Sequence, residues 1–118
     1  MFRYAAEIDA VVDGDTVDVT VDLGFRVSIR LRVRLAGCNA PERSTGAGRA
    51  AADAARAWVV EHGQAVEIAT QKSPEKFGRW LATVVAADGH DLAADLIAAG
   101  HAVPWDGRGA RPVPPAGL

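Results

Sequence analysis

The chain lacks several features that would narrow its class at once. It contains a single cysteine, Cys38, so no disulfide can form within it, and this side chain is expected to pack as a small apolar residue. No stretch is long and apolar enough to cross a membrane as a helix. The N-terminal residues lack the apolar core of a signal peptide, which favours a cytoplasmic protein, although a mature secreted form would look the same.

The chain also lacks a large excess of charge of either sign. Its 13 Lys and Arg residues and 15 Asp and Glu residues give a formal net charge of -2. Strong nucleic-acid binders are usually basic overall, so any binding of phosphate here must depend on a local cluster of cationic side chains. The length of 118 residues, 49% of them hydrophobic, is enough for one domain with a modest core.

Alternation of apolar and polar residues predicts five strands, because successive side chains of a strand point to opposite faces. The first three are expected at residues 4–12, 17–21 and 25–37, with a turn at Gly24 between the second and the third. Val66 and Ile68 mark the fourth strand, and residues 79–86 form the fifth. Residues 71–77 are expected to be a polar loop.

Two segments have helical spacing instead. Ala47, Ala51, Ala54 and Trp58 predict a helix over residues 49–61 that ends at Gly63, preceded by a loop of small residues at 44–48. Asp91 is expected to cap a short second helix that ends at Gly100. The Pro- and Gly-rich residues 108–118 are expected to form an irregular tail after a domain of residues 1–107.

This order of elements predicts an α+β, mainly β fold. Five short strands, with one helix between the third and fourth and a second helix after the fifth, fit an OB-fold barrel. Such barrels commonly bind oligonucleotides, but the fold alone does not establish a function.

Oxygen-bearing side chains gather where two predicted strands meet loops. Asp13-Gly14-Asp15-Thr16 precedes the second strand, and Asn39-Ala40-Pro41-Glu42 follows the third. The carboxylate of Asp15, the amide oxygen of Asn39 and the carbonyl oxygen of Ala40 are ligands suited to a hard cation such as Ca²⁺ or Mg²⁺. Each segment alone suits a turn equally well, so the prediction of a metal site depends on their combination.

Arginines accompany these acids. Alternation along the third strand places Arg34 at the same rim as the acids, where it and Arg79 could clamp a phosphate. Arg26, Arg30 and Arg32 in the same row are better interpreted as a solvated strand face. Glu42 could act as a general base toward water, or it could be an exposed loop acid paired with Arg43.

Four short motifs, taken together, resemble a known family. Asp-Gly-Asp-Thr-Val at 13–17, Val-Arg-Leu at 33–35, Asn-Ala-Pro-Glu at 39–42 and Lys-Phe-Gly-Arg at 76–79 occur in the order and spacing of the staphylococcal-nuclease-like, or thermonuclease, domain. The resemblance covers residues 8–103. It implies an OB barrel and a Ca²⁺-dependent phosphodiesterase that cuts DNA and RNA and leaves 3′-phosphates, with Mg²⁺ or Mn²⁺ as other possible metals.

The resemblance also implies roles for individual residues. Asp15 matches the first metal ligand, and Asp13 matches an acid near the ion that does not bind it directly. Arg34 and Arg79 match the two catalytic arginines, and Glu42 matches the catalytic glutamate.

Two positions differ from the family pattern. Asn39 stands where the family usually has a second ligand carboxylate, which predicts weaker binding of Ca²⁺. Phe77, beside Lys76 in the expected substrate site, stands where a tyrosine often contacts a phosphate. Trp105 could offer a stacking surface to a base of single-stranded or unpaired nucleic acid, or it could cover one end of the barrel.

Two other functions remain open from the sequence. A non-catalytic domain of this family that binds nucleic acid or protein would agree with Asn39, Phe77 and the negative net charge. Retention of Asp15, Arg34, Glu42 and Arg79 together favours the nuclease. An unrelated OB-fold binder is least favoured, because acids placed opposite arginines repel phosphate unless a cation lies between them.

Overall fold

The computed structural model of the chain describes residues 2–71 and 78–105. The predicted substrate-binding residues Lys76 and Phe77, and the expected tail at 108–118, lie outside the described residues. Within those two described ranges, no helix is long and apolar enough to cross a membrane.

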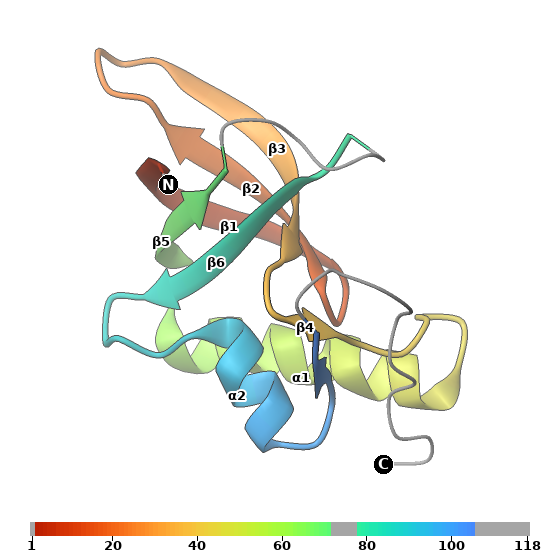
Figure 1. Ribbon diagram of the computed structural model, residues 1–118. Helices are drawn as coiled ribbons and strands as arrows, with labels where there is room; N and C mark the ends of the chain where they lie inside the picture. Colours follow the sequence, from red (N-terminus) through yellow and green to blue (C-terminus); the bar gives the residue numbers. More distant parts are fainter. Residues whose placement is uncertain (1, 72–77, 106–118) are drawn as a thin grey trace.

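Five long strands close into a barrel with the order β1-β2-β3-β6-β5 (Figure 1). Their bounds are Phe2–Asp13 for β1, Thr16–Asp22 for β2, Ser28–Leu35 for β3, Ala65–Thr70 for β5 and Trp80–Ala86 for β6. All neighbours pair antiparallel except β3 and β6, which are parallel. The helices are α1 (Gly46–His62), between β3 and β5 along the chain, and α2 (Leu92–Ala98), after β6. The predicted α+β class with a five-stranded OB-fold barrel is therefore confirmed.

The interior of the barrel is filled by the apolar residues of the alternating strands. Val17, Val19 and Val21 of β2 are all buried, and they face a core that includes Val33 and Leu35 of β3. This inward set fixes the register of β2 on β3, because a slip of one residue would turn every valine toward solvent. Thr16 consequently lies opposite Arg34.

Two further strands, each of two residues, were not predicted. β4 (Cys38–Asn39) pairs antiparallel with β7 (Val103–Pro104), and the Trp105 backbone N–H donates to the Gly37 carbonyl at 3.0 Å. This pairing brings residues from the end of the described chain across the segment that follows β3. As a result, Trp105 lies beside the rim of the barrel.

The first helix begins earlier than the spacing predicted. Thr45 is its N-cap, with a hydroxyl that accepts from the Gly48 N–H at 2.9 Å, so residues 46–48 belong to the first turn of α1 and not to a loop. Gly63 ends the helix with φ of 94°, as predicted. Asp91 caps α2 by accepting from the Ala94 N–H at 3.1 Å, which confirms the second predicted start.

The turn between β2 and β3 also differs from the prediction. Phe25 and Arg26 were placed in the third strand, but both have positive φ, 56° and 62°, and the strand begins at Ser28. The Leu23 N–H donates to the Val27 carbonyl at 2.9 Å. This bond closes the hairpin at residues 23 and 27, so Phe25 and Arg26 lie in the turn and not in a strand. A left-handed conformation costs a non-glycine residue about 1–2 kcal/mol, which tertiary pairing here overrides.

Replacing Arg26 by glycine should therefore stabilise the protein. Arg26→Gly is expected to raise the free energy of unfolding by about 1 kcal/mol, because glycine adopts positive φ without the steric cost of a Cβ atom. Urea denaturation measures the change. Ser28→Gly, in the regular part of the hairpin, is the matched control and should lower it by roughly 0.5–1 kcal/mol. A loss of stability in Arg26→Gly would contradict the strain argument.

Candidate metal and phosphate site

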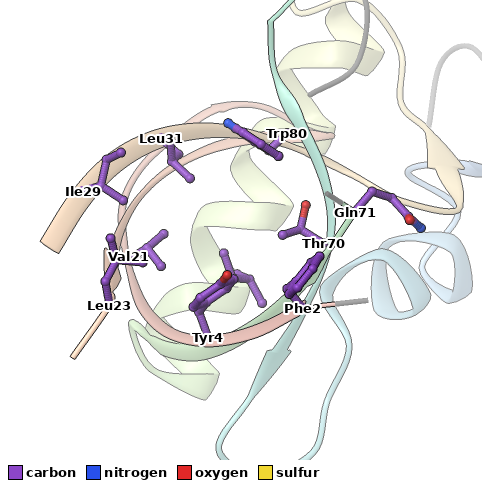
Figure 2. A pocket seen from close by; sticks show the side chains of 10 residues that line it. Phe2, Tyr4, Val21, Leu23, Ile29, Leu31, Thr70, Gln71 and Trp80 are labelled. Carbon is purple, nitrogen blue, oxygen red and sulfur yellow. The ribbon is translucent and has the colours of Figure 1, made fainter. Parts of the chain in front are cut away.

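One mouth of the barrel contains an apolar cavity that is not the predicted site. Figure 2 shows its lining, in which Tyr4, Val21, Thr70 and Trp80 surround the opening. Its volume is about 290 Å³, and none of the predicted metal ligands or catalytic residues lines it. Apolar walls offer nothing to a phosphate or a metal ion, so the candidate site must be sought at the acids.

Asp15 directly precedes β2 and is only 8% exposed. Its Oδ2 atom accepts from the Ala40 backbone N–H at 3.1 Å, and its Oδ1 atom accepts from the Thr16 hydroxyl at 3.2 Å. The Leu35 N–H donates to the Asp15 carbonyl at 2.8 Å. The Asp15 backbone is therefore fixed to the end of β3, and its carboxylate is fixed to the Ala40 backbone and the Thr16 hydroxyl.

Arg34 is the central cation of this cluster and is 5% exposed. Its Nη2 atom donates to the Cys38 carbonyl at 3.1 Å and to Asn39 Oδ1 at 3.3 Å, and it lies 3.5 Å from Asp15 Oδ2. Its Nη1 atom donates to the Leu35 carbonyl at 3.3 Å. The Trp105 ring covers the guanidinium, whose central carbon lies 5.1 Å from the ring centroid.

The oxygens of Asp15 and Asn39 are thus both in contact with one nitrogen of Arg34. A positive charge already lies between the two side chains that the sequence predicted as metal ligands. Oxygen donors of this kind fit Ca²⁺, which prefers carboxylate, amide and carbonyl oxygens. The chemistry of the donor set therefore agrees with a calcium ion, provided that Arg34 yields part of its contact with these oxygens.

Asp13 is partly buried and lies close to a second acid, Asp15. Its Oδ1 atom accepts from the Asp15 N–H at 3.2 Å. Burial, together with the Asp15 side chain and its charge, raises the pKa of Asp13 to about 6. A second carboxylate held this close to Asp15 indicates a region that favours an additional cation.

Glu42 lies apart from these buried groups, on an exposed segment after Pro41. Its backbone is nevertheless well fixed, because its carbonyl accepts from the Thr45 N–H at 3.0 Å and from the Thr45 hydroxyl at 2.7 Å. The Glu42 side chain is therefore exposed to solvent, and it is attached to a backbone that hydrogen bonds fix just before α1. This placement suits a group that must meet water.

Arg79 directly precedes β6. The parallel pairing sets Trp80 opposite Val33 and Leu81 opposite Arg34, which brings the second predicted catalytic arginine to the strand next to the first. Trp105 lies against Arg34, with its ring centroid 5.1 Å from the guanidinium carbon. Its role as a stacking surface for a base stays a prediction.

Three residues that support the site were missed from the sequence. Gly14 packs so closely that an added Cβ atom would lie 2.7 Å from Ala51 Cβ and 2.9 Å from Ala40 Cβ. Gly48 touches the backbone of Glu42 in the same way, and Thr45 joins that backbone to the helix. The repeated alanines of α1, among them Ala51, were a sequence signal for close packing against this helix. Nothing in the sequence indicated a close contact at Gly48.

Comparison with known proteins gives one match. None of the curated proteins matches the chain. A family model described as "Staphylococcal nuclease homologue" matches residues 32–110, more than half of the chain. The matched part contains Arg34, Asn39, Glu42 and Arg79, whereas Asp13 and Asp15 precede it. This chain therefore belongs to the staphylococcal nuclease homologue family.

Proposed function

We propose that the protein is a calcium-dependent nuclease that hydrolyses phosphodiester bonds of DNA or RNA and leaves 3′-phosphates. The observation that carries the proposal is the contact of one Arg34 nitrogen with the oxygens of both Asp15 and Asn39 in a buried setting. Burying an acid, an amide and a guanidinium costs desolvation free energy, and apolar residues at the same rim could fill a purely structural role without that cost. Grouped in this way, the acid, the amide and the guanidinium favour a site for a cation and a phosphate.

The metal ligands would be Asp15, Asn39 and the carbonyl oxygen of Ala40. Calcium bound there would neutralise charge on the phosphate and help to orient it. Mg²⁺ or Mn²⁺ could take the same oxygens. Asp13 would remain behind Asp15, where its hydrogen bond to the Asp15 N–H holds the turn.

The protein's own groups would carry the remaining chemistry. Glu42 accepts a proton at its carboxylate from water, for which its exposed position on a fixed backbone is suited. The water oxygen bonds to phosphorus, the bond from phosphorus to the 5′ oxygen breaks, and the leaving 5′ oxygen takes a proton from solvent. Arg34 and Arg79 donate N–H groups to the phosphoryl oxygens as negative charge develops there. An unpaired strand can present its phosphates to these groups without a complementary strand in the way, so single-stranded or unpaired nucleic acid is the proposed substrate.

A fluorogenic single-stranded oligonucleotide, incubated with the purified chain, tests this function. Cleavage is expected with Ca²⁺ and not after chelation, and the new ends should carry 3′-phosphates. Binding of the oligonucleotide without cleavage in Ca²⁺, Mg²⁺ and Mn²⁺ would refute the enzyme and leave the non-catalytic binding domain as the function. Absence of both binding and cleavage would refute the nuclease and the nucleic-acid-binding alternative, and would leave a protein-binding domain.

Restoring a carboxylate at Asn39 should strengthen metal binding. Asn39→Asp is expected to raise the affinity for Ca²⁺ by about tenfold, because an added negative ligand charge favours the cation. Calorimetric titration with CaCl₂ measures the affinity. Gln71→Glu adds the same charge at an exposed position and is the matched control, expected to bind Ca²⁺ like the unmodified protein. Equal affinities for Asn39→Asp and the unmodified chain would show that position 39 does not reach the ion.

A further inference from the structure

A second cluster of chemically active side chains lies at the other end of α1. His62 ends this helix, Asp88 and His90 lie in the connection after β6, and Asp95 lies in α2. Figure 1 shows the β6–α2 connection beside the C-terminal end of α1. The predicted calcium site adjoins the first turns of α1, and 17 residues of helix span about 25 Å. The two clusters are therefore separate.

The potential ligand atoms of this cluster already converge. One ligand atom each from His62, His90 and Asp95 can be chosen so that all three lie within 4.8 Å of one another. His90 Nδ1 is 2.8 Å from Asp95 Oδ2, and His62 Nε2 is 4.0 Å from the same oxygen. Ligands at about 2.0–2.1 Å around a tetrahedral ion lie about 3.4 Å apart. The two separations from Asp95 Oδ2 would therefore change by about 0.6 Å, and no separation in the group would have to shorten by more than about 1.4 Å.

The neighbouring groups orient these ligands. His62 Nδ1 is hydrogen-bonded to Asp88 Oδ2, which leaves His62 Nε2 facing Asp95. A carboxylate that holds the far nitrogen of a histidine is the usual outer partner of a metal-binding imidazole. Asp95 is held in turn by the Trp58 indole N–H, which donates to its Oδ2 atom at 2.8 Å.

The charge of the cluster also favours a divalent cation. Asp88 and Asp95 supply two carboxylates, and Glu61 Oε2 lies 3.8 Å from His62 Nε2. The His62 and His90 rings stack with centroids 4.4 Å apart, so protonating both would place two positive charges face to face. A single metal ion bound by both imidazoles would balance the carboxylates without that repulsion.

We infer that His62, His90 and Asp95 form a binding site for a transition-metal ion such as Zn²⁺, distinct from the predicted calcium site. Imidazole nitrogens suit Zn²⁺, Ni²⁺ and Cu²⁺, whereas Ca²⁺ prefers oxygen ligands only. The three ligands come from α1, the β6–α2 turn and α2, so the bound ion fastens α2 to the end of α1. The site adjoins a cavity of about 510 Å³ whose lining also includes His101.

Calorimetric titration of the whole chain with Zn²⁺ tests the site. The titration is made in excess Ca²⁺, at a pH above the pKa of histidine because protons compete for the same nitrogens. One ion per chain is expected to bind, and Asp15→Ala should bind it equally well. His90→Gln, at an exposed position, should abolish this binding, and Asp88→Asn should weaken it by about tenfold.

The third histidine of the same cavity provides the matched control. His101 lies outside the group of converging ligand atoms, so His101→Gln should retain the affinity for Zn²⁺. Circular dichroism establishes that each variant is folded, and the visible absorption of bound Co²⁺ reports whether nitrogen ligands surround the metal. The inference is overturned if the unmodified chain binds no Zn²⁺, if folded His90→Gln binds it equally well, or if folded Asp15→Ala loses it.

Discussion

Replacing Arg34 by lysine is expected to reduce phosphodiester cleavage by about 100- to 1,000-fold, the loss typical of removing one aligned donor to a developing negative charge. Lysine keeps the positive charge beside Asp15. It cannot keep the planar fork with which Arg34 reaches the Cys38 carbonyl, Asn39 Oδ1 and the Leu35 carbonyl at once. Initial rates with a fluorogenic oligonucleotide at saturating Ca²⁺ measure the effect.

Arg32 supplies the control, two residues earlier on the same strand. Its side chain is 55% exposed and pairs with Asp18 on the outer face of the barrel. Arg32→Lys should change neither cleavage nor the free energy of unfolding by more than about 0.5 kcal/mol. Wild-type cleavage by Arg34→Lys would show that Arg34 serves only the structure. Arg34→Ala is less informative, because leaving Asp15 buried without its partner costs about 3–5 kcal/mol of stability.

Arg32 is exposed and Arg34 is buried, and only part of this difference could be predicted from the sequence. Alternation along β3 predicted correctly that Arg30, Arg32 and Arg34 share a face and that Arg34 reaches the rim beside Asp15. The burial of Arg34 was not predicted, since the strand period carries no information about what covers a strand end. Arg34 is buried because β4 and β7 pair next to it and bring Trp105 over its guanidinium.

That cover could not be predicted from local pattern. β4 and β7 contain two residues each, and residues 38–39 pair with residues 103–104 far along the chain. Two residues are too few to show alternation, and Pro104 gives a signal against a strand. The barrel strands were predictable because their valines repeat the inward face over several residues, whereas these short strands depend on the completed fold.

Gly48 illustrates a second limit of prediction from the sequence. Helix propensity disfavours glycine at this position, whereas the close contact with the Glu42 backbone requires it. Small residues at 44–48 predicted a loop, yet Gly48 lies in the first turn of α1. A Cβ atom at this position would lie 1.7 Å from the Glu42 carbonyl oxygen and 2.8 Å from Arg43 Cα. Glycine is therefore required for the helix to approach the backbone that carries the proposed general base.

Gly48→Ala is accordingly expected to lower both stability and activity. The added Cβ atom would meet backbone atoms, which cannot rotate aside as a side chain does. Residues 42–43 must therefore move away from α1, which lowers the free energy of unfolding by about 1–3 kcal/mol. Over most of this range the loss exceeds the gain of about 1 kcal/mol that alanine usually brings to a helix. A displacement of Glu42 by about 1 Å would reduce cleavage by roughly 100-fold. Urea denaturation and initial cleavage rates measure the two effects.

Gly46, in the same helical turn, isolates the contact from helix propensity. A Cβ atom there would have only Arg49 Nη2 nearby, at 3.9 Å. Gly46→Ala should therefore keep its activity and gain up to about 1 kcal/mol of stability. If Gly48→Ala also gained stability and cleaved at the unmodified rate, the approach of α1 to Glu42 would not determine where that carboxylate lies. Loss of activity in Gly48→Ala alone, with the protein still folded, would connect the position of the Glu42 backbone directly to catalysis.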